Sequence, residues 1–129
     1  MNDTFTAIVC IDRLSASHSR AWDSDLCAGV FRDEAGAVRV VYPSITARSL
    51  FLDSIPPLRR AARGNGLVTD AIIRALKRIA RAAGEKDCEA IVCELETMAA
   101  ETRGSAMLKH EIDEICDDIQ KAISTVKET

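Results

Sequence analysis

The amino-acid sequence predicts one compact α+β domain over residues 1–129, with a mixed sheet in the order β-β-β-α-β-α and two long helices packed on it. Three observations favour this class. Short apolar runs alternate with turn residues, which is typical of strands. Two longer segments instead repeat apolar residues at helical spacing. Because 47% of the residues are apolar, a chain of this length can bury a core without disulfides.

Four segments are expected to be strands. Residues 4–11 (TFTAIVCI) and 90–96 (AIVCELE) are apolar runs that suit strands at the centre of a sheet. Residues 26–32 and 37–42 flank the acidic turn DEAG, and this pattern predicts a hairpin. The polar, serine-rich residues 13–25 between the first two strands are expected to form a loop.

Two segments are expected to be helices. The first begins at Asn65 and Gly66 or at Thr69, and it ends at Gly84, a residue that favours the end of a helix. The second runs from about residue 105 to 126, where apolar residues recur at intervals of three and four. Between these elements and the hairpin, residues 43–66 are expected to be a long irregular connection, because Pro56 and Pro57 interrupt a short helical stretch.

The composition also bears on location and cofactors. The chain has no apolar run long enough to cross a bilayer and no basic leader, so we expect a cytoplasmic protein without a membrane partner. The five cysteines are odd in number and none forms a C-x-x-C pair, which favours free thiols over a zinc site. No cofactor motif is present, so no cofactor is expected.

Charge is segregated along the chain, and this is the main indication of function. Residues 59–86 hold eight basic residues against two acidic ones, whereas residues 87–129 hold four against eleven. On the first long helix, Arg74, Arg78 and Arg81 share one face with Lys77. The terminal helix carries the acidic residues Glu111, Asp113, Glu114, Asp117 and Asp118.

These faces predict a small binding or regulatory protein that acts through protein-protein contact rather than catalysis. The acidic helix would contact a basic partner or a second copy of the chain. Nucleic acid is a less favoured partner of the basic residues, because few aromatic side chains are available for stacking. A simpler interpretation is that both faces are solvated, or that the two helices lie together and neutralise each other.

The residues suggest two catalytic arrangements. His18 stands among Ser15, Ser17 and Ser19 and could serve as a general base for one of them. The carboxylates Asp12, Asp70, Glu94 and Glu96 would gather at one sheet edge if the first and fourth strands are parallel neighbours. Oxygen ligands of this kind suit Mg²⁺ or Mn²⁺.

This element order, with its acids at strand ends and at the start of a helix, resembles the ribonuclease H-like fold superfamily. The resemblance implies an alternative function, a divalent-metal-dependent nuclease. In that case Asp12, Asp70 and Glu94 or Glu96 would be the metal ligands, and Mg²⁺ or Mn²⁺ the cofactor.

Overall fold

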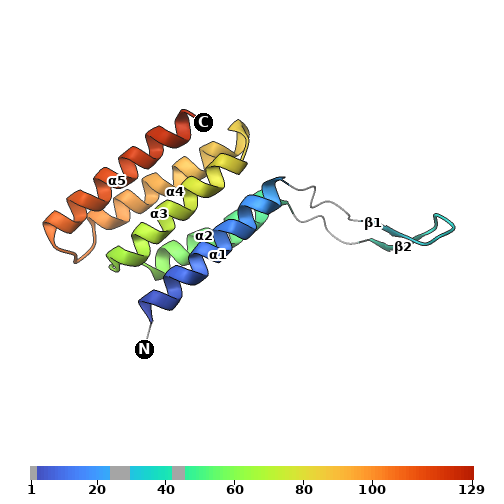
Figure 1. The fold of residues 1–129 in the computed structure, drawn as a ribbon, viewed down its shortest axis with the longest axis horizontal. Helices are drawn as coiled ribbons and strands as arrows, with labels where there is room; N and C mark the ends of the chain where they lie inside the picture. The colour runs from blue at the N-terminus through green and yellow to red at the C-terminus, as the bar shows by residue number, and fades with distance from the viewer. Residues whose placement is uncertain (1–2, 24–29, 42–45) are drawn as a thin grey trace.

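The computed structural model is a bundle of helices with a hairpin extending from one end (Figure 1). It describes residues 3–23, 30–41 and 46–129. The elements of these residues are α1 Thr4–Asp23, β1 Val30–Arg32, β2 Val38–Val41, α2 Ala47–Ala61, α3 Gly66–Ala82, α4 Glu85–Arg103 and α5 Lys109–Lys127. The predicted mixed sheet is therefore wrong, because the strands of the described residues form one two-stranded sheet, β1-β2.

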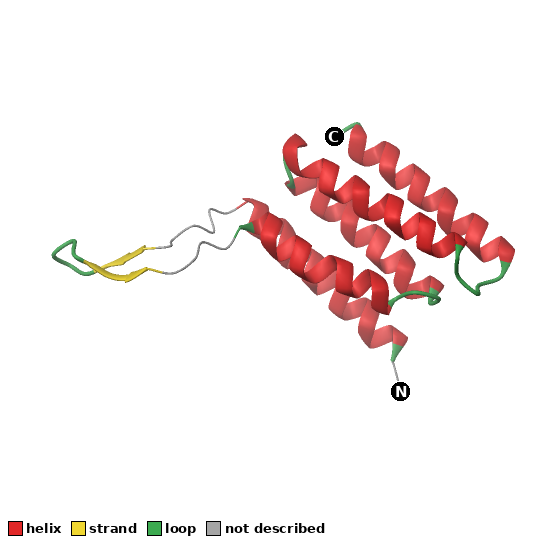
Figure 2. Ribbon diagram, turned by 180° about the vertical axis from the view of Figure 1, so that it is seen from behind, coloured by secondary structure: helices red, strands yellow, loops and turns green. Residues whose placement is uncertain are grey.

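Helix α3 lies at the centre of the bundle and contacts α1, α4 and α5. Helix α2 packs against α1 and α4. Successive helices run in opposite directions, so that α1, α3 and α5 point the same way (Figures 1 and 2). The core between them is made of aliphatic side chains and Phe51, and its largest fully buried members include Ile72, Leu76, Ile79, Ile91, Leu95 and Ile119.

The first predicted strand, residues 4–11, is the beginning of α1. A short apolar run fits a buried helix as well as a strand, and only its continuation distinguishes the two. The continuation here is helical, because Ile11, Ser15 and His18 are buried at intervals of four and three. Of residues 13–25, expected to be a loop, residues 13–23 therefore belong to the same helix, and residues 24–25 lie outside the described residues. The Ser15 hydroxyl donates to the Asp12 carbonyl at 2.8 Å, and the Ser19 hydroxyl donates to the Ser15 carbonyl at 2.9 Å.

The fourth predicted strand, residues 90–96, lies within α4. Its buried side chains are Ile91, Leu95 and Met98, which recur at helical intervals and face the core. The strand prediction was wrong because it rested on the short apolar run alone, whereas the helical spacing continues to Thr102, which is also buried.

The irregular connection predicted for residues 43–66 is also wrong, because residues 47–61 form α2. Thr46 caps this helix, since its hydroxyl accepts a hydrogen bond from the Ser49 amide at 3.0 Å. Pro56 and Pro57 lie inside the helix. Each removes one helical hydrogen bond, to the carbonyls of Leu52 and Asp53, and both of those residues are exposed to water.

Both predicted helices are confirmed. The predicted starting residue Asn65 caps α3, and its side-chain oxygen accepts from the Val68 amide at 3.2 Å. The terminal helix, α5, begins four residues later than expected, at Lys109. The Glu111 carboxylate accepts from the Leu108 amide at 3.1 Å and so satisfies a donor before the first turn.

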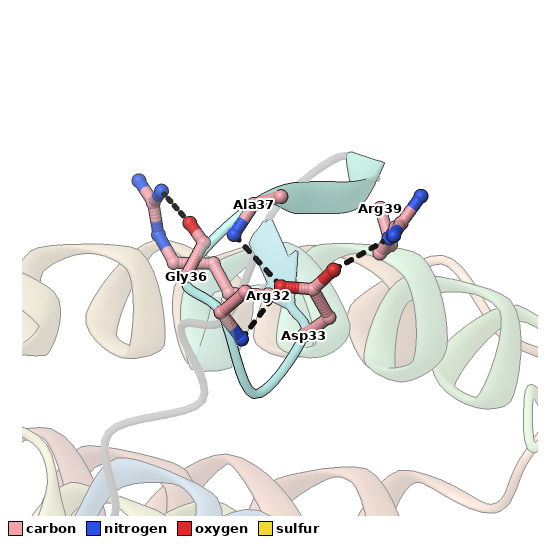
Figure 3. Close-up of polar contacts among 6 residues, drawn as sticks. Arg32, Asp33, Gly36, Ala37 and Arg39 are labelled. Atoms are coloured by element: carbon pink, nitrogen blue, oxygen red, sulfur yellow. Dashed lines mark hydrogen bonds and ion pairs between the residues drawn. The ribbon is translucent and has the colours of Figure 1, made fainter.

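The predicted hairpin is present, although residues 26–29 and 42 lie outside the described residues. The two strands are antiparallel, with Val30 opposite Val41. Asp33 organises the turn: its carboxylate accepts from the amides of Ala35 and Ala37 and from the Arg39 guanidinium at 2.8 to 3.0 Å (Figure 3). Gly36 has a φ of +81°, which glycine adopts without strain.

Candidate functional site

The charged residues of the terminal helix border an open groove between α3 and α5. The groove has a volume of about 550 Å³. Ile73 of α3 and Ile115 of α5 are apolar residues of its lining, together with Met107 before α5. Gly66 allows a close approach here, because a Cβ at this position would lie 3.2 Å from the Met107 terminal methyl group. Four carboxylates complete the lining, those of Asp70, Glu111, Glu114 and Asp118.

The structure divides the five predicted acidic residues of α5 into two sets. Glu111, Glu114 and Asp118 are three and four residues apart and line the groove. Asp113 and Asp117 are exposed and are not among its lining residues. Glu111, Glu114 and Asp118 can therefore act together on a ligand in the groove, whereas Asp113 and Asp117, one turn apart from each other, lie outside its lining.

The predicted basic residues Arg74, Arg78 and Arg81 are exposed on α3. Arg74 pairs with Asp70 one turn earlier on the same helix. The Arg78 guanidinium donates to the Asp12 carbonyl at 3.2 Å and to the Ser15 hydroxyl at 3.1 Å. Over the described ranges, no ion pair joins α3 to α5, so the two helices do not neutralise each other through direct contacts.

The four carboxylates expected at a sheet edge are not brought together. Asp12 is exposed on α1, Asp70 lies on α3, and Glu94 and Glu96 lie on α4. Their predicted convergence required two parallel strands that are helices in the structure. Nowhere in the described part of the chain do three His, Cys, Asp or Glu side chains form a group that could hold a metal ion.

Sequence reasoning missed a buried charge cluster between α2 and α4. Arg59 is 8% exposed, and its Nε lies 2.8 Å from a carboxylate oxygen of Glu94. Its Nη1 pairs with Glu101, which also contacts Arg63 at 3.2 Å. Phe51, Ile55 and Arg59 recur at intervals of four residues, which places them on one side of a helix. This spacing could have identified the arginine, but the two prolines suggested a break in the helix.

The cluster shifts the protonation of its members. Hydrogen bonding to Arg59 holds the pKa of Glu101 below its ordinary value, and the charges of Arg59 and Arg63 act in the same direction. Burial by itself would lower the pKa of Arg59, but hydrogen bonds to Glu101 and Glu94 raise it above its usual value. Arg59 and Glu101 are therefore charged at neutral pH, and the cluster is an electrostatic connection between α2 and α4.

His18 also connects two helices, and it does so away from the serines expected to accompany it. The ring is 6% exposed, and Nε2 lies 2.9 Å from the Ser54 hydroxyl of α2. Nδ1 lies 3.1 Å from the Leu14 carbonyl of its own helix. Both ring nitrogens are thus engaged in the interface between α1 and α2, which is a structural arrangement.

A larger groove, of about 640 Å³, lies between α1 and α2 and is mainly apolar. Its one carboxylate, Asp3, accepts a hydrogen bond from the Thr6 hydroxyl, which lowers the pKa of Asp3. The groove between α3 and α5 differs from it in combining an apolar lining with a concentration of negative charge.

Fold and site together define a five-helix bundle, over the described residues, with an acidic groove and a projecting hairpin. Residues 1–78 match the model of a family described as "Predicted membrane protein (DUF2254)", and the chain belongs to this family. The resemblance to the ribonuclease H-like superfamily is therefore wrong, because both the helical fold and the family match contradict it. No curated protein and no solved structure matches the chain. No helix in the part of the chain that the structure describes has the length and apolar character needed to cross a membrane.

Proposed function

We propose that this chain is a helical binding module that holds a basic, amphipathic segment of a protein partner in the groove between α3 and α5. The observation that carries the proposal is the combination of four carboxylates with an apolar lining in one open groove. Helical ligands commonly bind such grooves through apolar side chains one turn apart. Cationic side chains on the same segment would then meet the carboxylates.

The electrostatics of α5 support a cationic ligand. Residues 87–129 hold four basic residues against eleven acidic ones, so the α5 wall of the groove lies in the strongly acidic part of the chain. Within the described residues, Glu114 makes no ion pair. Asp118 pairs only with Lys121, one turn later on α5, and this pair is exposed to solvent. Such exposed pairs contribute little to stability, so these carboxylates can exchange partners at low cost. Complementary charge would mainly raise the rate of association and the specificity.

The apolar lining supports a protein segment over a free cation. Leu67, on the α3 side of the groove, is 67% exposed, and Ile73, Met107 and Ile115 extend the apolar surface inward. Ile73 and Ile115 are already buried, so the apolar surface that a ligand can still cover belongs mainly to Leu67 and Met107, and covering it stabilises a complex by about 25 cal/mol per Å². A small hydrated ion would gain none of this energy.

Family membership favours a place of action at or near a membrane, since the family is described as predicted membrane proteins. We propose that the described helices form a part of the protein that lies outside the bilayer.

The proposal can be tested with a synthetic helical peptide of about 14 residues made of leucine and lysine, the length at which an isolated helix becomes stable. We expect it to bind, with an affinity that falls as salt is raised. A peptide of leucine and glutamate with the same spacing should not bind. Isothermal titration calorimetry measures both.

A matched pair of variants locates the binding. The double variant Glu111→Lys with Glu114→Lys reverses two groove carboxylates, and Asp113→Lys with Asp117→Lys makes the same change of charge outside the groove. We expect the first variant to lose most of the binding and the second to keep it. Equal losses in the two variants would show that the peptide responds only to net charge and would contradict the proposal.

A further inference from the structure

Helices α1 and α3 present a continuous surface because they run parallel and in register. Near their starts, the Asn65 side chain donates to the Thr4 hydroxyl at 3.2 Å. Further along, the Arg78 guanidinium donates to the Ser15 hydroxyl at 3.1 Å. Figure 1 shows the two helices side by side along most of their length. Residues at equivalent distances from the two starts therefore lie at the same level of the bundle.

On the outward side of α1, exposed apolar residues are followed by two arginines, and the exposed Asp12 lies between the apolar residues and the arginines. Phe5 is 74% exposed and Val9 is 38% exposed, and the exposed Arg13 and Arg20 follow them. The intervals of four, four and seven residues place all four on one side of the helix. This side is opposite the buried Ile11.

The outward residues of α3 follow the same order. Leu67, at the start, is 67% exposed, and the exposed Arg74, Arg78 and Arg81 follow at intervals of seven, four and three, with the half-exposed Asp70, which is paired to Arg74, between Leu67 and the arginines. Because the two helices are parallel and in register, Phe5 and Leu67 lie toward one end of the surface, and the arginines lie beyond them. We call these outward residues of the two helices the α1–α3 face.

We propose that the α1–α3 face binds the surface of an anionic lipid bilayer, with Phe5, Val9 and Leu67 entering the interface and the arginines contacting lipid phosphates. Arginine presents a planar set of donors that matches phosphate oxygens. Each basic side chain near an anionic leaflet contributes about 1 kcal/mol to binding, and apolar side chains add a term that salt does not screen. This surface shares Leu67 with the α3–α5 groove, but its other members lie outside the groove lining and the proposal does not depend on the proposed function.

The charge distribution of the whole chain supports a lipid surface. Residues 1–78, the part matched by the family of predicted membrane proteins, hold eleven basic residues against eight acidic ones. Residues 79–129 hold six against twelve. Eight of the nine large apolar residues that are exposed in the described part of the chain also lie in residues 1–78, three of them on the α1–α3 face and the others on β2 and α2. Basic charge and exposed apolar side chains thus occur together, as a bilayer interface requires.

Nucleic acid is a weaker match to the same charges. Single-stranded nucleic acids bind through aromatic stacking platforms beside basic side chains. Of the described aromatic residues, Phe5 is the one exposed on this face, and it lies at the end away from the arginines. The apolar side chains of the face would make no favourable contact with a phosphate backbone, whereas they can insert into the interface of a bilayer.

Flotation of the full chain with vesicles tests the proposal. We expect binding to vesicles of phosphatidylcholine with phosphatidylserine, and none to vesicles of phosphatidylcholine alone. The triple variant Arg13→Glu, Arg20→Glu and Arg81→Glu should weaken binding by about a hundredfold or more, from the contribution of each basic residue. These three arginines make no ion pair within the described residues, so their replacement removes no such pair from the fold.

The control variant carries the same change of charge elsewhere. Arg103, Lys109 and Lys127 are exposed on α4 and α5, and replacing them with glutamate should leave most of the vesicle binding. Phe5→Ser should weaken binding even at high salt, because it removes an apolar contact. Glu111→Lys with Glu114→Lys should keep vesicle binding, which separates this proposal from that of the peptide groove.

Three outcomes would overturn the proposal. The first is an absence of binding to anionic vesicles by a chain whose circular dichroism and thermal unfolding show that it is folded. The second is an equal loss in the two triple variants. The third is tighter binding to a DNA or RNA oligonucleotide than to the vesicles at the same salt, which would assign the arginines to nucleic acid.

Discussion

The Arg59 guanidinium of α2 donates to the Glu94 carboxylate of α4 across 2.8 Å in the interior of the bundle. Glu101 of α4 pairs with the same guanidinium. These pairs join α2 to α4 beside the buried apolar side chains Phe51 and Ile55 of α2.

Removing the arginine should destabilise the fold strongly. Arg59→Met leaves two largely buried carboxylates side by side without a cation, and breaking a buried ion pair in this way costs about 3–5 kcal/mol. Urea denaturation followed by circular dichroism measures the loss. The neighbouring Arg60 is exposed, so Arg60→Met should change the free energy of unfolding by less than about 0.5 kcal/mol. Similar losses for both variants would contradict the assignment of the cluster.

The same cluster should make stability depend on acid pH. Because the pKa of Glu101 is lowered in the folded chain, its contribution is present above the ordinary glutamate pKa. It is lost as the pH falls through the lower folded-state value. We therefore expect the free energy of unfolding to decrease below about pH 4, the ordinary range for glutamate.

The pH effect can be assigned to the cluster by comparison with Arg59→Met. Without the cation, protonation relieves the repulsion between Glu94 and Glu101, so the stability difference from the natural chain should narrow as the pH falls. Urea denaturation at a series of pH values measures it. A difference that stays constant from neutral to acid pH would show that the carboxylates do not titrate through this contact.

The Trp22–Phe51 contact should fix the start of α2 against the end of α1. The ring centroids are 5.8 Å apart in an edge-to-face arrangement, and Phe51 is fully buried. Phe51→Ala should cost about 3–5 kcal/mol, the usual range for a buried phenylalanine, and change the fluorescence of Trp22. Leu52→Ala alters the next residue, which is half exposed, and should have a much smaller effect on both readings.

Replacing Asp33 should loosen the hairpin turn while the helical bundle stays folded. Asp33→Ala removes the acceptor of the Ala35 and Ala37 amides and the partner of Arg39. We expect faster hydrogen exchange of the Ala37 amide, with the unfolding of the helices unchanged, because the strands pair only with each other in the described residues. Glu34→Ala, at the next position, is the control, and it should leave the exchange rate unchanged.

The elements that were predicted correctly are those whose pattern is complete within a short stretch. The α3 helix combines the capping residue Asn65 with apolar spacing over several turns, and the hairpin combines a glycine turn with flanking valines. The errors occurred where a short apolar run was read in isolation. Residues 4–11 and 90–96 suit a strand by composition, but the buried positions that follow them show that both belong to helices.

The candidate site was predicted only in part. The acidic character of α5 was predicted from the sequence, and three of its five acidic residues line the groove. The α3 side of the groove could not be predicted, because Asp70 and Ile73 line the groove only when α3 packs against α5. The predicted meeting of Asp12 with Glu94 required a sheet that is absent from the described residues.

The sequence by itself determined the amphipathic α3 and α5, the hairpin and the segregation of charge along the chain, because each depends on neighbours within a few turns. Only the tertiary structure decided that α1, α2 and α4 are helices and which charges meet. Burying the side of α1 that carries Ile11 and His18 favours a helix there. Arg59 becomes buried beside Glu94 only when the described helices pack around a shared core. Contacts between residues distant in the chain determine these features, and local spacing does not specify them.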